Sequence, residues 1–539
     1  MKLLNITALG LSVLALSLFS SCIDDKTTDA ATDVNIVEFE NFENSYTAVA
    51  HEDHVKIEPK LKGSVYGDDD SKYRYQWTLT QSVGEKEITT TIGTEKNLDY
   101  LMDHDPATYT ISLRVYDTTN GMLSEKSTTV TAVSPFVKGY YIYGAKPDGQ
   151  VAMDFVSFIE GRDTMFFRDI YKNELKIKNP KNLIFTGHDA QFSYSGTFRI
   201  NLIAVADQTV EVEGDPTLSK FGDLKKTAME DKCFPTIPVS EPMHLLTICP
   251  QAYDGSSNTN KSRTRISIAE NEVFGGSFTT GPEIYGNPCN RYSATSSELF
   301  KPAPFVFFKN NAYGNNYTDF MLYDLTNHTF CCLFSIYSAP SACSKYLESA
   351  DIATSETFYW DQNKYKPVRD LVYGFNASVS GNSYALMKDT ENSFFVYQFQ
   401  VGSRYSASKK IRAYNIDKTE ATDMDKATFF AFFTKQPYLL YTVGSKLYVV
   451  NYAANKCVMA KDFGDEITYM GMDRASTNSD SEFRVCTYSD ANKGNIYKYA
   501  IKDDVNNIVV EQLTDHWKTD LRVVKLEYRN STAGQRNIE

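Results

Sequence analysis

Apolar and polar residues alternate in short segments between residues 36 and 133. Residues 107–117 place every second side chain on an apolar side, and residues 73–79 do the same. A period of two is typical of a strand that is buried on one face. The two apolar sides consist of Tyr109, Ile111, Leu113 and Val115, and of Tyr73, Tyr75, Trp77 and Leu79. We therefore expect half-buried strands in this region, with Trp77 as a central core residue.

The length of this region and two of its aromatic residues indicate its fold. About a hundred residues that carry a tryptophan on a middle strand and a tyrosine at the start of a later one are typical of an immunoglobulin-like sandwich. Trp77 and Tyr109 hold these two positions. The sequence thus predicts a β-sandwich over residues 36–133.

Residues 136–530 have a different rhythm. Strand-turn-strand units recur there without a helical period, at spacings of roughly 45 to 70 residues. Repeats of this length are typical of propeller blades, which have four short strands each. The units start near Gly139, Asn182, His244, Pro304, Leu371, Pro437 and Phe483. We predict an all-β protein in which the sandwich precedes a β-propeller of about seven blades, with residues 531–539 as a C-terminal tail.

The first 35 residues lack both patterns. Their apolar run from Leu3 to Phe19 is broken by polar residues, so it falls short of the roughly 20 apolar residues that span a membrane. Lys2 before this run and Ser20-Ser21 after it predict a signal peptide over residues 1–21. Residues 22–35 are small, polar and charged, which predicts a flexible tether.

Cys22 follows the two serines directly. Small residues before a cysteine resemble the lipobox of bacterial lipoproteins, in which the cysteine is acylated and becomes the new N-terminus. Asp24 and Asp25 resemble the surface-export signal of Bacteroidetes lipoproteins. This resemblance implies a lipid on Cys22 and anchoring in the outer membrane, with the protein facing the cell exterior. An ordinary secretory peptide followed by a chance cysteine is the alternative.

The sandwich region resembles a PKD domain in two stretches, Tyr75-x-Trp77 and the alternating run from Tyr109 to Asp117. It departs from that family after Trp77, where the Gly-Asp-Gly turn is absent. Together with the lipobox, the chain resembles the PKD-like lipoproteins of Bacteroidetes. The resemblance implies a non-catalytic accessory role in the capture of glycans or peptides beside a starch-utilisation-type (SusCD-like) TonB-dependent importer.

Charge argues against one class of partner. The formal net charge of the chain is −13, and it becomes −14 without the signal peptide because Lys2 is the only charge in that segment. Nucleic-acid binding needs clustered lysines and arginines, so we expect no nucleic-acid partner. The 36 tyrosines and 33 phenylalanines favour strands.

Eight cysteines follow Cys22, and none forms a CxxC pair. Sparse cysteines in a large chain are typical of buried, small apolar groups. A disulfide that involves Cys343, a short loop after Cys331 and Cys332, is the alternative, because export permits disulfides.

The sequence contains no local catalytic motif. A GxSxG elbow and the GxxxxGK[ST] and GxGxxG phosphate loops are absent. His51 and His54 flank two acids, but their spacing is one residue short of the HExxH motif that places two imidazoles on one helix face. We predict a protein without catalytic residues or a metal site. The alternatives are a carbohydrate-active propeller enzyme whose two acids come from different blades, and a purely structural subunit of a surface complex.

Calcium is the one cofactor for which the sequence offers ligands. Residues 67–70 and 490–494 each combine Asp or Asn oxygens with a glycine. Tight turns need the same residue types, so a turn without an ion is the alternative at both places. We expect no resident cofactor.

One aromatic segment, residues 355–367, predicts a binding site. Tyr359, Trp360 and Tyr365 stand there beside Asp361 and before Pro367, in a setting too polar for a blade strand. Aromatic faces flanked by an acid can stack on a sugar ring or hold a peptide side chain. We therefore predict these four residues as ligand contacts, with a hydrophobic plug between two blades as the alternative.

Overall fold

The computed structural model describes residues 34–159, 161–172, 174–185, 201–213, 225–249, 264–277, 285–308, 319–334, 340–346, 348, 356–377, 381–402, 407–475, 481–502 and 507–530. All regular structure in these residues consists of strands and four 3-10 helices, which confirms the all-β prediction. The helices are η1 (Asp70–Lys72), η2 (Met229–Lys232), η3 (Gln362–Lys364) and η4 (Met424–Lys426). Within these ranges, no helix has the length and apolar character needed to cross a bilayer.

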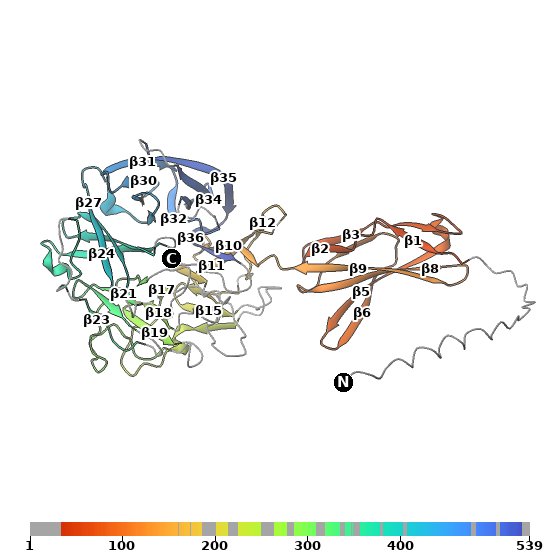
Figure 1. Ribbon diagram of the computed structural model, residues 1–539, viewed down its shortest axis with the longest axis horizontal. Coiled ribbons are helices and arrows are strands. Elements are labelled where there is room, and N and C mark those ends of the chain that lie inside the picture. The colour runs from red at the N-terminus through yellow and green to blue at the C-terminus, as the bar shows by residue number, and fades with distance from the viewer. Residues whose placement is uncertain are drawn as a thin grey trace, which may run out of the picture. The chain divides into compact units, whose positions relative to one another are not determined.

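The chain divides into two compact units (Figure 1). Apart from residues 104–106, the second unit begins at Val133. The N-terminal unit is a sandwich of a five-stranded antiparallel sheet, β2-β9-β8-β5-β6, and the strand pairs β1-β4 and β3-β7. Its strands are β1 (Val37–Glu40), β2 (Ser45–Val49), β3 (His54–Ile57), β4 (Lys60–Gly63), β5 (Tyr73–Val83), β6 (Lys86–Gly93), β7 (Leu98–Leu101), β8 (Thr108–Asp117) and β9 (Leu123–Val133).

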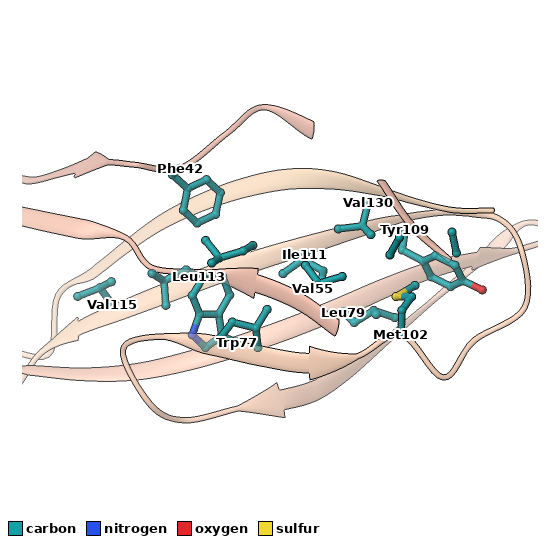
Figure 2. Packing of buried hydrophobic residues seen from close by; sticks show 14 of the residues in the cluster. Phe42, Val55, Trp77, Leu79, Met102, Tyr109, Ile111, Leu113, Val115 and Val130 are labelled. Carbon is teal, nitrogen blue, oxygen red and sulfur yellow. The ribbon is translucent and has the colours of Figure 1, made fainter. Parts of the chain in front are cut away.

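The core of the sandwich lies along β5 and β8, as the period of two predicts (Figure 2). Trp77 is fully buried; it lies opposite Leu113 in the sheet and stacks on Phe42 with ring centroids 5.9 Å apart. The predicted face of β8 is confirmed, because none of its four residues is more than 1% exposed: Tyr109, Ile111, Leu113 and Val115.

The described residues of the C-terminal unit form seven antiparallel sheets, each of which runs from an inner to an outer strand. The first is β36 (Arg522–Asn530), β10 (Lys138–Ala145), β11 (Val151–Ser157) and β12 (Met165–Phe167). The second is β13 (Asn182–Phe185), β14 (Asn201–Val205), β15 (Thr209–Glu213) and β16 (Lys225–Ala228), and the third is β17 (Leu245–Cys249), β18 (Thr264–Ala269) and β19 (Glu272–Ser277).

The remaining four sheets follow in chain order. The fourth is β20 (Phe307–Phe308), β21 (Phe320–Asp324), β22 (Thr329–Leu333) and β23 (Ser344–Lys345), and the fifth is β24 (Arg369–Asn376), β25 (Ser383–Asp389), β26 (Phe394–Gln400) and β27 (Lys409–Ile416). The sixth is β28 (Phe430–Phe433), β29 (Tyr438–Val443), β30 (Lys446–Asn451) and β31 (Lys456–Asp462), and the seventh is β32 (Glu466–Met472), β33 (Glu482–Ser489), β34 (Lys493–Lys502) and β35 (Val509–Thr519).

These sheets form a closed ring, which confirms the β-propeller of about seven blades. Seven hydrophobic clusters lie in the described part of this unit, and each joins residues of two neighbouring sheets. The last cluster joins Cys486 and Ile496 of the seventh sheet to Tyr140 and Ile142 of the first. Because each sheet packs on both faces, strands such as β11 and β21 are buried at every position and read as continuous apolar runs.

The ring closes through its two chain ends. β36 comes last in the sequence, yet it is the inner strand of the first sheet and pairs with β10 from Lys138↔Asn530 to Ala145↔Arg522. The predicted repeat starts near Asn182 and His244 fall at the first strands of their sheets, whereas Gly139, Pro437 and Phe483 fall at the second strands β10, β29 and β33. The starts near Pro437 and Phe483 fall one strand late because the inner strands β28 and β32 lie before the stretches in which the strand-turn-strand pattern is clearest.

The antiparallel order gives the ring two distinct faces. Connections from the first to the second strand and from the third to the fourth lie on one face, and all others lie on the opposite face. The chain enters the ring at Lys138, where the second strand of the first sheet begins. We therefore call the face that carries the first-to-second and third-to-fourth connections the linker face.

Candidate functional site

The predicted aromatic segment connects the fourth sheet to the fifth. It follows the outer strand β23 and leads into the inner strand β24, so it lies on the face opposite the linker face. The segment is held by the β21–β22 turn, since the Phe330 N–H donates to the Trp360 carbonyl at 3.1 Å and the Gln362 N–H donates to the His328 carbonyl at 2.8 Å.

Trp360 fills the space between the two sheets. Its side chain is 2% exposed and stacks on Tyr346 at 5.0 Å, while Phe330 and Phe358 contact it edge-on at 5.5 and 5.1 Å. The rings around it cover its faces, so no ligand reaches them. The plug interpretation therefore holds for Trp360, and the prediction that it contacts a ligand is wrong.

The other three predicted residues are partly exposed. Asp361 caps η3, because its carboxylate accepts a hydrogen bond from the Asn363 N–H at 3.1 Å. Tyr359 and Tyr365 form an edge-to-face pair with centroids 5.6 Å apart, and the Tyr365 hydroxyl accepts from the Tyr359 N–H at 3.1 Å. Asp361 thus has a structural task in the turn, while both tyrosines stay predicted ligand contacts.

Arg369, the first residue of β24, lies between two aromatic rings. Its guanidinium carbon is 3.7 Å from the Tyr365 centroid and 3.4 Å from that of Phe395. One nitrogen donates to the Tyr397 hydroxyl at 2.8 Å, and that hydroxyl in turn donates to Gln362 at 3.0 Å. Stacking and the hydrogen bond hold the planar cation in one orientation.

Asp370, beside Arg369, contacts two further side chains, His328 and Tyr323. Its Oδ1 lies 2.7 Å from His328 Nδ1 and accepts from the Tyr323 hydroxyl at 3.1 Å. Burial raises the pKa of Tyr323, and the Asp370 carboxylate raises it further. His328 and Asp370 are 34% and 42% exposed, so this polar pair faces solvent.

We call the six half-buried residues of this surface the Arg369 patch: His328, Tyr359, Tyr365, Arg369, Asp370 and Phe395. The patch offers an oriented cation, three aromatic rings and a histidine paired with a carboxylate. Such a set can stack on a ring-shaped ligand and bind its polar groups. A histidine paired with a carboxylate can also act as a base, but among the described residues no serine or cysteine hydrogen-bonds to His328.

The other candidates from the sequence hold ordinary structural positions. His51 and His54 pair with Asp103 and Asp99 at 2.7 and 2.5 Å. In the first calcium candidate, Asp69 caps η1 and Asp70 pairs with Lys96 at 2.8 Å. No group of three His, Cys, Asp or Glu side chains in the described ranges is placed to hold a metal ion. Cys22, Asp24 and Asp25 lie outside the described residues.

Sequence reasoning missed Arg369, Asp370, Phe395 and His328. Arg369 and Asp370 follow the aromatic segment within five residues of Tyr365, so their charge beside it was a usable signal. His328 and Phe395 carried none, because each is separated from the segment by more than twenty residues of chain and reaches it through the packing of the fourth and fifth sheets.

Comparison with known protein families gives a match for the N-terminal part of the chain. Residues 22–175 match the model of the PKD-like family. These residues form a PKD-like family region. The match covers the PKD-like sandwich and continues through β10, β11 and β12, so it also includes three strands of the first sheet of the ring. No curated protein sequence matches the chain significantly.

Solved structures similar to this protein include two from Bacteroides species. A quinonprotein alcohol dehydrogenase-like protein from Bacteroides thetaiotaomicron shares 12% identity, covers 92% of this chain and 99% of its own, and gives a TM-score of 0.39. A putative 6-phosphogluconolactonase from Bacteroides uniformis shares 10% identity, covers 85% and 99%, and gives 0.32. The propeller fold is assigned from the seven sheets of this protein itself.

Proposed function

We propose that this protein is a surface-exposed outer-membrane lipoprotein that captures a glycan or peptide as a non-catalytic subunit beside a SusCD-like importer. Acyl chains on Cys22 would hold it to the membrane, with residues 22–35 as the tether and Asp24 and Asp25 as the export signal. The PKD-like sandwich would act as a spacer, and the propeller would carry the binding surface.

The observation that carries this proposal is the Arg369 patch. It holds an immobilised guanidinium between Tyr365 and Phe395 and adds Tyr359 as a further half-buried ring. An oriented cation with aromatic neighbours favours binding, since little side-chain entropy is lost when a ligand arrives. The patch lies on the face opposite the linker face, so the chain does not enter the ring on the side of the patch.

The anchor and the partner are tested together in the native membrane. We expect the full chain, tagged at its C-terminus and extracted with mild detergent, to co-purify with a TonB-dependent transporter and its lid lipoprotein in equal amounts. Cys22→Ala should leave the membrane fraction and lose both partners, whereas Cys457→Ala, which alters a half-buried cysteine of β31, should keep them. Purification of the wild type without partners would contradict the importer role.

The Arg369 patch is tested with an array of oligosaccharides and short peptides. We expect Arg369→Met to weaken binding of the recognised ligand at least about tenfold, because one charge-assisted hydrogen bond contributes roughly 1.5–3 kcal/mol. The matched control is Arg412→Met on the outer strand β27, where an exposed arginine also lies over a tyrosine ring.

Two outcomes would oppose this assignment. Equal binding by wild type and Arg369→Met would show that the ligand binds elsewhere. Cleavage of the bound compound, abolished by His328→Gln, would make the protein an enzyme instead of a capture subunit.

A further inference from the structure

The Arg369 guanidinium is covered on both of its flat faces. Its central carbon lies 3.7 Å from the Tyr365 ring centroid and 3.4 Å from the Phe395 ring centroid. Two rings this close to one carbon cannot share a side, because their atoms would overlap, so they cover opposite faces of the planar cation. The ring of a ligand therefore cannot stack on Arg369. A ligand reaches the cation along its edge, where the N–H groups point.

Most of this edge is open to a ligand. A guanidinium carries several N–H donors in one plane. Among the described residues, the Tyr397 hydroxyl is the single hydrogen-bond acceptor for Arg369, at 2.8 Å from one nitrogen. The other nitrogens are not among the buried side-chain atoms that lack a partner, in contrast to nitrogens of Arg484 and Arg529. They therefore face solvent and can donate to an incoming group.

Arg369 also lacks a counterion within the chain. Three other arginines of the same unit pair with a carboxylate at 2.6 to 3.2 Å, namely Arg168, Arg484 and Arg522. Arg369 forms no ion pair with any Asp or Glu that the structure describes. Asp370 follows it directly, but the Asp370 carboxylate contacts His328 and the Tyr323 hydroxyl instead. A cation that two rings hold in place without a counterion favours an anion from outside the chain.

We propose that the Arg369 patch binds a sugar acid and that Arg369 receives the carboxylate of this sugar edge-on. The inference rests on the proposed function, because it names the ligand of the same patch. The carboxylate oxygens would accept hydrogen bonds in the plane of the guanidinium, and the sugar hydroxyls would meet Asp370 and His328.

The shape of the Arg369 edge selects a carboxylate among the anions. Both carboxylate oxygens can accept parallel hydrogen bonds from one guanidinium, and the two groups then lie in one plane. Tyr365 and Phe395 lie above and below that plane. A planar group fits between them, whereas a tetrahedral sulfate directs oxygens out of the plane and toward the rings.

The polar pair beside Arg369 matches the hydroxyls of a sugar. The Asp370 side chain is 42% exposed, so its carboxylate can accept hydrogen bonds from hydroxyls while it repels a second negative charge. His328 uses Nδ1 for Asp370, which leaves Nε2 for a further hydroxyl. A sugar acid carries one carboxylate and several hydroxyls on one ring. The apolar face of that ring can lie on Tyr359, which is half-buried.

A peptide matches the same surface less well. Its terminal carboxylate carries the charge that Arg369 requires, but the adjacent groups are an amide and a side chain in place of hydroxyls. That side chain would need an apolar pocket, and Trp360 already fills the space between the two sheets with 2% of its surface exposed. Peptide binding is therefore a separate outcome of the test.

The test is calorimetric titration of the full chain with tetrasaccharides of D-galacturonate, D-glucuronate and D-mannuronate. Each is compared with its carboxyl-reduced form, which has a hydroxymethyl group in place of the carboxylate. We expect the recognised acid to bind at least about tenfold more tightly than its reduced form, because the charge-assisted hydrogen bonds are lost in the latter. This comparison uses the wild-type protein, so it does not depend on the folding of a variant.

Variants of Arg369 locate the effect. Arg369→Met should bind the acidic and the reduced form with equal affinity. Arg369→Lys keeps the charge but loses the planar edge, so its affinity for the acid should lie between those of Arg369→Met and the wild type. The matched control is Arg412→Met, which removes an exposed arginine over the Tyr414 ring of β27 and should keep the full preference for the acid.

The outcomes separate this inference from the capture role. Equal binding of acidic and reduced sugars by the wild type, with both weakened in Arg369→Met, would overturn carboxylate recognition and leave capture by the patch in place. Binding of a tripeptide with a free C-terminus but of no tetrasaccharide would overturn the sugar. Full preference for the acid in Arg369→Met, or equal affinity of Arg369→Lys and the wild type, would overturn edge-on recognition. No binding of any sugar or peptide would oppose both proposals.

Discussion

Replacing Asp473 by asparagine is expected to lower the free energy of unfolding of the propeller by about 3–5 kcal/mol, because the change removes the fully buried carboxylate that Arg484 and Lys498 share. The Asp473 side chain is fully buried after β32. Its carboxylate accepts from the Tyr140 hydroxyl at 2.5 Å and lies 3.1 Å from nitrogens of both Arg484 and Lys498. A neutral amide would keep the volume of the side chain and remove the charge that both cations face.

The position of this network makes the effect global for the ring. Asp473, Arg484 and Lys498 belong to the seventh sheet, and Tyr140 belongs to the first, so the contacts join the two sheets where the chain closes the ring. Arg484 also lies 3.9 Å from the ring centroid of Trp517. Hydrogen exchange followed by mass spectrometry in increasing urea would report the loss on peptides of β10 and β33.

The matched control is Asp515→Asn. Asp515 pairs with the same arginine at 3.2 Å but is 47% exposed, so its loss should cost less than about 1 kcal/mol. Similar losses for the two variants would show that burial does not set the strength of the Asp473 contacts.

The same carboxylate predicts a pH dependence. Burial raises the pKa of Asp473, but Arg484, the Tyr140 hydroxyl and Lys498 together outweigh burial and hold this pKa below its ordinary value. The folded-state pKa thus lies below the unfolded-state value of about 3.9, so the stabilisation is complete above that value and disappears as the pH falls through the folded-state pKa. The difference in stability between wild type and Asp473→Asn should stay constant near neutral pH and shrink below about pH 3.9.

Trp77→Ala is expected to lower the free energy of unfolding of the PKD-like sandwich by about 3–5 kcal/mol. The change removes a fully buried ring stacked on Phe42, and it removes the hydrogen bond that Nε1 donates to the Glu95 carbonyl at 2.9 Å. A domain of this size has a total stability of about 5–15 kcal/mol, so a large part of it would be lost. Hydrogen exchange should show the loss of protection on peptides of β5 and β8, with propeller peptides unchanged.

Thr89→Ala is the control within the same sheet. Thr89 lies on the exposed edge strand β6, and its replacement should change stability by no more than about 0.5 kcal/mol. Unchanged protection of β8 in Trp77→Ala would contradict the central place of the tryptophan in the core.

The two units differ in how far their sequences predict their interiors. In the sandwich, Tyr109 and Leu113 lie on the core side because alternation along one strand already states which face is buried. In the ring, both faces of each blade are covered, so alternation disappears and the repeat spacing becomes the useful signal. That spacing predicted the number of sheets, while the first strands of the last two sheets escaped it.

The candidate site was predictable only as far as it is local. Tyr359 and Tyr365 were found because they stand in one polar, aromatic segment. Trp360 belongs to the same segment but turns inward, since alternate side chains of an extended segment point in opposite directions and a neighbouring sheet was there to cover it. The sequence allowed both a ligand contact and a hydrophobic plug at Trp360, and it could not decide between these two roles.

The sequence by itself determined the strand-rich composition, the buried face of the PKD-like sandwich and the period of the ring, because each depends on residues close together in the chain. Only the tertiary structure decided the closure of the ring by β36 and the grouping of Arg369 with His328 and Phe395. Those contacts join residues far apart in sequence, and the side chains meet only because seven sheets pack face to face around one axis.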